Sequence, residues 1–181
     1  MDYPKNCHKL HPSDENCPFV ICADEFHDVL GASPEFTRLV ETDAHEGPVY
    51  WKDKNAILFT TVPKSTNIPI LTKRVAIKKL SLDNNQVSVW RESSNMANGM
   101  TIDREGRLRV CEQGTKSTPA RISSFNLDTQ DNETVVDQWW GLPFNSPNDI
   151  VVKSDNTIWF TDPSYGYLQG FKNPPEVGNF V

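Results

Sequence analysis

The chain repeats one pattern about every 50 residues. Each copy opens with a side chain that carries an oxygen donor, continues as an apolar run, turns at polar residues and ends in a second apolar run. The copies begin at Glu46, Asn98 and Asn148. A period of this length is typical of the four-stranded blades of a β-propeller, in which the innermost strands begin near one central axis. The repeat therefore predicts an all-β fold in which these three side chains approach one another.

From Phe36 the pattern is one of short alternating or apolar runs of four to six residues, separated by turn residues, as expected for antiparallel strands. Asn55, Gly106 and Asn156 occupy the same place in the three copies, at the end of the first turn. The predicted strands cover residues 36–40, 48–51, 56–61, 74–80, 86–90, 99–102, 108–111, 121–126, 133–136, 149–152 and 157–161.

Residues 1–35 lack this periodicity and are expected to form an N-terminal extension. Residues 36–181 are expected to form a partial propeller of about three blades, with units that start near residues 46, 98 and 148. Propellers close with four to eight blades, so about three blades leave apolar faces uncovered. We expect a truncated form of a longer parent, or a homodimer that covers these faces if the truncation is natural.

Composition excludes several functions. The 181 residues are 37% hydrophobic and carry a formal net charge of −6, with basic residues mixed among acids, which argues against nucleic acid as a partner. No apolar run has the length of a membrane-spanning helix, and the N-terminus lacks the layout of a signal peptide. A cytoplasmic protein with no membrane partner is expected.

Cysteine spacing gives little support for a structural zinc site. Cys7, Cys17 and Cys22 lie near His8 and His11, but they lack the paired spacing of such sites, and reduced thiols are expected instead. Cys111 lies in an apolar run and is expected to be a small buried side chain.

Glu46, Asn98 and Asn148 share hard oxygen donors, which suit Ca²⁺, with Mg²⁺ or Mn²⁺ as alternatives, better than a soft metal. The structural alternative is that Asn-Gly and Asn-Asp form turns and that Glu-Gly-Pro simply starts a strand. Equivalence within the repeat favours the metal site.

Acidic residues form a second candidate layer. Glu112 and Asp162 end the second strands of two units, where they would bind a substrate hydroxyl, position a water or lie exposed. Asp149 follows a proposed ligand directly and is the candidate catalytic carboxylate, and His45 is a weaker candidate base. No setting for a nucleophilic Ser and no nucleotide-binding loop is present.

Three stretches of the chain resemble the gluconolactonase and regucalcin (senescence marker protein) family over roughly residues 36–170. They are Glu46-Gly-Pro-Val-Tyr-Trp, the segment from Ala97 to Gly114, and Asn145-Ser-Pro-Asn-Asp-Ile-Val-Val with Trp159-Phe-Thr-Asp-Pro-Ser-Tyr-Gly. The resemblance implies a six-bladed propeller with one divalent cation, here Ca²⁺ or alternatively Zn²⁺, Mg²⁺ or Mn²⁺, that hydrolyses sugar lactones and in some members other esters.

Residue by residue, the resemblance implies that Glu46 and Asn148 bind the metal and that Asn98 and Glu112 contact substrate. It also implies a further ligand and general base, an Asp from a later unit that has no counterpart in this sequence. Gln113 stands where the family often has His, which is expected to alter substrate choice. The alternative function is a calcium-binding or protein-interaction propeller without catalysis. The Glu-Gly-Pro and Pro-Asn-Asp segments argue against a metal-free relative of the strictosidine synthase type.

Overall fold

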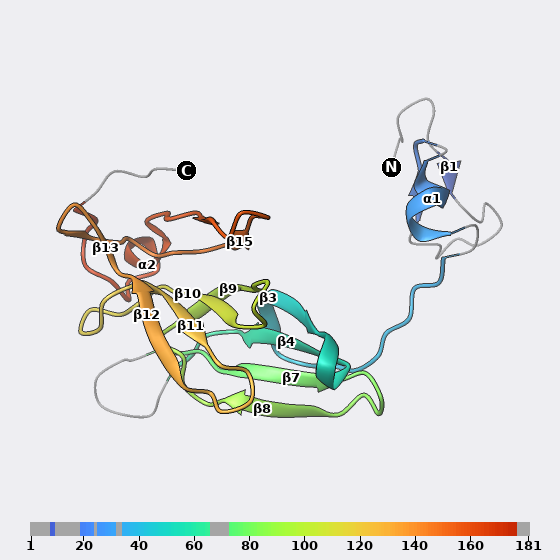
Figure 1. Cartoon of the computed structure of the whole chain (residues 1–181), viewed down its shortest axis with the longest axis horizontal. Coiled ribbons are helices and arrows are strands. Elements are labelled where there is room, and N and C mark those ends of the chain that lie inside the picture. Colours follow the sequence, from blue (N-terminus) through green and yellow to red (C-terminus); the bar gives the residue numbers. More distant parts are fainter. Residues whose placement is uncertain (1–7, 10–18, 24, 32–33, 66–72, 177–181) are drawn as a thin grey trace. The chain divides into compact units, whose positions relative to one another are not determined.

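The computed structural model describes residues 8–9, 19–23, 25–31, 34–65 and 73–176 (Figure 1). The chain divides into two compact units, Met1–Glu41 and Thr42–Val181. No helix in these described ranges is long and apolar enough to cross a membrane.

The described residues of the first unit form two short strands and one short helix. Strands β1 (His8–Lys9) and β2 (Val20–Ile21) pair antiparallel, and helix α1 covers Phe26–Leu30. Cys22 is disulfide-bonded, so the expectation of reduced thiols is wrong for this residue, while Cys7 and Cys17 lie outside the described residues. The strand predicted over residues 36–40 is also absent, because the side chains of Phe36 and Leu39 are exposed and no neighbouring strand pairs with this segment.

Two four-stranded antiparallel sheets form most of the second unit, and each follows the order of the sequence (Figure 1). The first sheet consists of β3 (Ala44–Trp51), β4 (Ala56–Thr61), β7 (Ile77–Ser81) and β8 (Val87–Arg91). The second sheet consists of β9 (Ala97–Ile102), β10 (Leu108–Glu112), β11 (Arg121–Phe125) and β12 (Asn132–Val136). The strand content confirms the all-β prediction.

As far as the structure describes it, to residue 176, the third copy of the repeat forms a pair of strands, β15 (Ile150–Val152) and β16 (Ile158–Phe160). Smaller elements complete the described structure. They are the 3₁₀ turn η1 (Lys52–Lys54), the pairs β5 (Lys64–Ser65) with β6 (Lys73–Arg74) and β13 (Gln138–Trp139) with β14 (Leu142–Pro143), and helix α2 (Tyr165–Leu168).

Equivalent turns follow the first strand of each copy. Asn55, Gly106 and Asn156 all have positive φ, at 41°, 77° and 66°. Each donates its backbone N–H to the carbonyl three residues earlier. Gly and Asn are the residues that adopt this left-handed conformation most readily, which explains why only these two types stand at the repeated position.

The core lies between successive sheets. Trp51, Leu58 and Ile77 of the first sheet belong to one buried cluster with Leu108, Val110 and Phe125 of the second sheet. A smaller cluster joins Cys111 and Ile122 to Ile150 of β15. Cys111 is a free, buried thiol, as predicted, and burial raises its pKa above the usual range. The β15–β16 sheet is less covered by neighbouring elements, because the side chains of Val151 and Trp159 are both more than half exposed.

Candidate metal and substrate site

The first strands of the three copies approach one another at their N-terminal ends. A Cβ atom on Gly47 of β3 would lie 2.4 Å from the carbonyl oxygen of Asn98, and one on Gly99 of β9 would lie 2.5 Å from that of Asn148. The N–H of Gly99 also donates to the Asn148 carbonyl at 2.7 Å. Glycine is therefore required at both junctions, where the strands approach closely.

This approach brings the three predicted oxygen donors to one cavity of about 360 Å³. Glu46, Asn98 and Asn148 all line it, each from the start of a different copy of the repeat. The other lining residues are His45, Thr61, Pro63, Val75, Ala97, Gln113, Tyr165 and Gln169.

Glu46 lies on an irregular part of β3. The register of β3 against β4 shifts on both sides of Glu46, where Gly47 has a φ of 57° and Pro48 has no N–H to donate. A bulge of this kind takes up an additional residue and redirects a side chain. The first copy has one more residue before its turn than the others, and the bulge accommodates it. The Glu46 side chain is 45% exposed, and its Oε1 lies 3.9 Å from His45 Nδ1.

Asn98 is buried on β9, and Gln113 follows the neighbouring strand β10. The backbone N–H of Gln113 donates to the Met96 carbonyl at 3.2 Å, and its Nε2 donates to the same oxygen at 3.4 Å. These contacts hold the Gln113 amide beside the start of β9. Its Oε1 is buried and has no hydrogen-bond partner among the described residues.

Asn148 is held by backbone contacts on both sides. Its N–H donates to the Thr161 carbonyl, and its own carbonyl accepts from Gly99. Asp149 is exposed and does not line the cavity, and its Oδ1 accepts from the N–H of Ile150 at 2.9 Å. The structure thus separates the predicted ligand Asn148 from its predicted catalytic neighbour.

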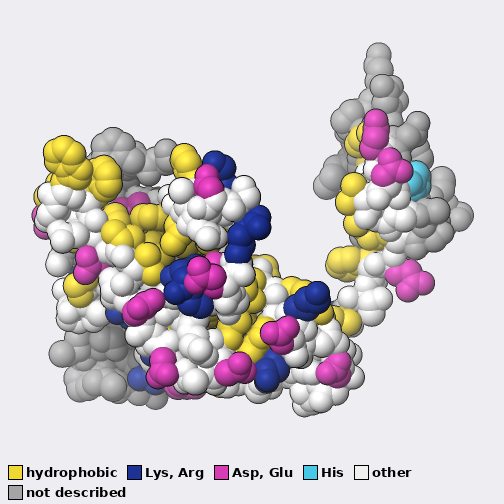
Figure 2. Space-filling model, viewed as in Figure 1, with side chains coloured by type: hydrophobic (Ala, Val, Ile, Leu, Met, Phe, Trp, Pro, Cys, Tyr) yellow, Lys and Arg dark blue, Asp and Glu magenta, His cyan; other side chains and the backbone are white. Residues whose placement is uncertain are grey.

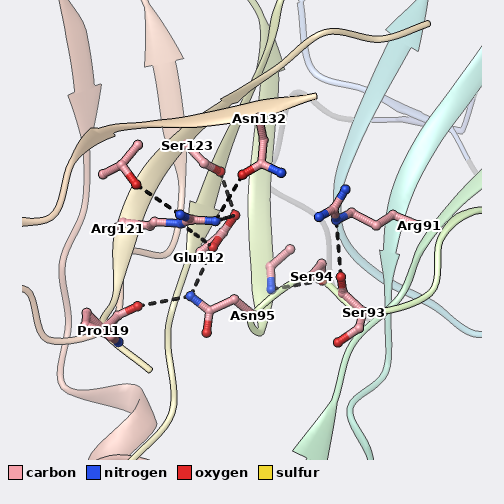
Figure 3. A network of polar contacts seen from close by, with 11 residues as sticks. Arg91, Ser93, Ser94, Asn95, Glu112, Pro119, Arg121, Ser123 and Asn132 are labelled. Carbon is pink, nitrogen blue, oxygen red and sulfur yellow. Dashed lines mark hydrogen bonds and ion pairs between the residues drawn. The ribbon is translucent and has the colours of Figure 1, made fainter. Parts of the chain in front are cut away.

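Glu112 lies in a polar network rather than among the residues that line the cavity (Figure 3). Arg121 donates from Nε to its Oε2 at 2.7 Å and from Nη2 to its Oε1 at 3.2 Å. Ser123 Oγ donates to Oε1 at 2.7 Å, and Asn95 Nδ2 donates to Oε2 at 3.0 Å. Both oxygens of this carboxylate, which is 1% exposed, are engaged within the protein.

Asp162 has a similar role one copy later. Its two carboxylate oxygens accept the backbone N–H groups of Asn145 and Ser146 at 2.8 and 2.7 Å. Burial raises the pKa of Asp162, while these hydrogen bonds and Lys172 oppose the rise. Asp162 therefore fixes the backbone of the segment that precedes Asn148.

The donor set fits a hard divalent cation. Glu46 would provide a carboxylate, and Asn98 and Asn148 would provide amide oxygens, which are the ligand types that Ca²⁺, Mg²⁺ and Mn²⁺ prefer. No group of three or more His, Cys, Asp or Glu side chains suited to a metal occurs in the part of the chain that the structure describes. The described cavity thus offers oxygen donors rather than the sulfur- and imidazole-rich sets that are common for zinc.

Three polar lining residues, Thr61, Tyr165 and Gln169, were not predicted from the sequence. Thr61 ends β4, at the place that Glu112 and Asp162 occupy in the later copies, so the repeat alignment could have identified it. Tyr165 and Gln169 come from helix α2 and the residue after it, beyond the aligned strands. The repeat carries no signal for a segment that lies outside it.

The sequence of residues 44–176 matches the protein-family model that describes the SMP-30/gluconolactonase/LRE-like region. A gluconolactonase of Zymomonas mobilis is 31% identical in an alignment 134 residues long that covers 67% of this chain and 33% of the relative. The lactonohydrolase oryL of Aspergillus oryzae is 25% identical in an alignment 150 residues long that covers 76% of this chain and 32% of the relative. The chain thus spans about a third of the length of these curated relatives.

Two solved structures are similar to this one. A putative gluconolactonase superposes with a TM-score of 0.70 at 28% identity, over 87% of this chain and 51% of the other. A gluconolactonase from Xanthomonas campestris superposes with a TM-score of 0.59 at 26% identity, over 74% of this chain and 40% of the other.

Proposed function

The chain belongs to the SMP-30/gluconolactonase/LRE-like family, and from this premise we propose that it forms part of a divalent-cation-dependent hydrolase that opens lactones. One observation carries the proposal. Glu46, Asn98 and Asn148, which start three equivalent strands, all line the same cavity. The relatives named gluconolactonase and lactonohydrolase give the substrate class, and sugar lactones are its proposed members.

Glu46 and Asn148 are the proposed cation ligands, and Ca²⁺ is the proposed ion. A cation bound there would polarise a lactone carbonyl and lower the pKa of a water molecule. Asn98 is buried and lines the same cavity, and its proposed role is to orient the lactone by hydrogen bonds from its amide rather than to bind the cation. The junctions at Gly47 and Gly99 hold the three side chains in place before a substrate arrives.

Proton removal is a separate task. Of the two sequence-predicted bases, His45 lines the cavity, whereas the Asp149 carboxylate accepts a hydrogen bond from Ile150 outside it. We propose that Asp149 orients the backbone next to Asn148, and that His45 or a carboxylate from a later copy of the repeat accepts the proton. A complete ring would contain six blades, of which the two four-stranded sheets and the β15–β16 pair would provide the first part.

The experiment combines cation titration with hydrolysis of D-glucono-δ-lactone. Glu46→Gln retains the shape of the side chain but removes its charge, so we expect Ca²⁺ affinity and Ca²⁺-dependent hydrolysis both to fall at least about tenfold. Asn148→Ala is expected to act in the same direction. Glu92→Gln, the same change at an exposed residue outside the cavity, is the matched control.

Three outcomes distinguish a metal-dependent hydrolase from the alternatives. Loss of both Ca²⁺ affinity and Ca²⁺-dependent hydrolysis in Glu46→Gln supports the hydrolase. Calcium binding that depends on Glu46, without turnover of any lactone in a panel, would favour the non-catalytic calcium-binding reading instead. Hydrolysis that is unchanged after chelation and in both variants would contradict a metal centre at this cavity.

A further inference from the structure

Gln113 presents an unused hydrogen-bond acceptor at the candidate site. The side chain lines the cavity with Glu46, Asn98 and Asn148, yet Gln113 is only 5% exposed. Its Oε1 has no partner among the described residues, although a buried carbonyl oxygen normally has at least one. Because Gln113 is a lining residue of the cavity, we take the missing partner of this buried atom to be a donor that a ligand would bring.

The orientation of the amide follows from its other contact. Met96 offers a carbonyl oxygen, which accepts but cannot donate, so the atom 3.4 Å from it must be Nε2. The backbone N–H of Gln113 donates to the same carbonyl. These two contacts anchor one end of the side chain to the segment before β9 and leave Oε1 as the free end.

The strand order places Gln113 one step away from the proposed ligands. Glu46 lies on β3, Asn98 lies on β9 and Asn148 immediately precedes β15, and these are the first strands of the three copies. Gln113 instead follows β10, the second strand of its sheet, which pairs with β9. A cation held by the first strands would bind the reacting carbonyl of the substrate. Gln113 would then contact a part of the substrate that lies away from this carbonyl.

The chemistry of the acceptor defines what it selects. A neutral amide oxygen accepts from a hydroxyl group, whereas an ionised carboxylate has no proton to offer it. We infer that Gln113 is a specificity-determining residue whose Oε1 accepts a hydrogen bond from a ring hydroxyl of the substrate. The inference rests on the proposed lactone-opening function and deepens it, because it distinguishes polyhydroxylated lactones from unsubstituted ones.

The first test compares two lactones that differ in hydroxyl groups. Gln113→Met retains the length of the side chain and removes its acceptor. We expect kcat/KM for D-glucono-δ-lactone to fall about tenfold or more, and that for δ-valerolactone to change less than about twofold. Gln138→Met makes the same change at an exposed residue of β13 outside the cavity and should affect neither substrate. An equal effect of Gln113→Met on both lactones would overturn the inference.

The second test does not depend on turnover. The cyclic polyol 1,5-anhydroglucitol has the ring hydroxyl groups of the sugar but no ester, and tetrahydropyran has neither. We expect the polyol, but not tetrahydropyran, to shift the side-chain amide NMR signal of Gln113, and Gln113→Met to weaken polyol binding about tenfold or more. Absence of a polyol-specific shift would overturn the inference.

The two tests keep this inference apart from the function on which it rests. Polyol binding that depends on Gln113, in a protein that hydrolyses neither lactone, would refute the hydrolase while supporting the assignment of Gln113. Hydrolysis of both lactones at rates that Gln113→Met does not change would support the hydrolase and refute the assignment of Gln113. If Gln113→Met weakens Ca²⁺ binding as strongly as Glu46→Gln does, Oε1 is a cation ligand and the hydroxyl assignment is wrong.

Discussion

Glu112 is a carboxylate that is 1% exposed and accepts hydrogen bonds from Arg121, Ser123 and Asn95 (Figure 3). We expect Glu112→Gln to lower the free energy of unfolding by about 3 kcal/mol, because Arg121 keeps its charge and loses its partner. Urea denaturation measures this change. Glu105→Gln is the control, since the Glu105 side chain is 61% exposed in its ion pair with Arg107, and its expected effect is at most about 1 kcal/mol. Equal effects of the two substitutions would show that the buried network contributes little stability.

Position in the repeat predicted which residues come together, but not which hydrogen bonds they form. Glu46, Asn98 and Asn148 occupy equivalent positions, so the repeat alone placed them at one end of their strands. Glu112 also ends its strand, yet the register of β10 against β11 pairs it with Arg121. A side chain nine residues away can satisfy a carboxylate only in one register, and the sequence pattern does not specify that register. The lack of a partner for Gln113 Oε1 is likewise a property of packing.

At the scale of elements, Asp43 connects the start of β3 to strands β5 and β7. Its Oδ2 lies 2.6 Å from Lys64 Nζ, and its Oδ1 lies 2.7 Å from Lys78 Nζ. Hydrogen bonds from Lys64 and then Lys78 are the main causes that lower the pKa of Asp43 to about 2, from an ordinary value of 3.8. The carboxylate is therefore charged in the folded protein down to a pH at which it would be neutral in the unfolded chain.

A lowered pKa in the folded state stabilises the protein above the unfolded pKa, and this contribution is lost as the pH falls through the folded value. For Asp43 the loss is expected between about pH 4 and pH 2, with a magnitude of at most about 2 kcal/mol. Urea denaturation over this range should show a smaller decrease in stability for Asp43→Asn than for the unsubstituted protein. Asp53→Asn, at an exposed carboxylate of η1, should follow the unsubstituted protein. Parallel pH profiles for all three proteins would contradict the role of Asp43.

The strand predictions succeeded where the repeat supplied a pattern and failed where it did not. The run over residues 56–61 matches β4, because its apolar residues are buried in the first sheet. The predicted strand over residues 36–40 lies before the first copy of the repeat, and no described strand pairs with it. Helix α2 was also missed, since four residues that follow a proline carry too short a pattern to indicate a helix.

For the molecule as a whole, apolar surface gathers where the described sheets end. Trp139, Trp140 and Leu142 of the β13–β14 hairpin are exposed, as are Val151 and Trp159 of the two-stranded sheet. Figure 2 shows apolar side chains at the surface of this unit. The second four-stranded sheet packs on one face against the first sheet and on the other against Ile150 of β15. The exposed side chains of Val151 and Trp159 leave the other face of the β15–β16 pair uncovered in the described structure. This is the surface expected where further strands of a propeller would pack, whether they come from a longer chain or from a second copy.

The junctions between successive sheets make the candidate site depend on the whole arrangement. A Cβ on Gly99 would lie 2.5 Å from the Asn148 carbonyl and 2.7 Å from the Asp149 Cα, both backbone atoms that no rotamer change can move. Gly99→Ala must therefore separate β9 from β15, which would displace Asn148 from Asn98 and weaken the hydrogen bond from the Gly99 N–H. We expect a loss of about 2 kcal/mol or more in unfolding free energy, measured in urea, and at least about a tenfold loss in Ca²⁺ affinity, measured by titration calorimetry. Gly106→Asn is the matched control, because Gly106 has open space around its Cβ position and Asn already occupies the equivalent turn at Asn156 with a φ of 66°. If Gly99→Ala loses stability but retains full Ca²⁺ affinity, the cation site does not depend on the β9–β15 junction, and Asn148 is not a ligand.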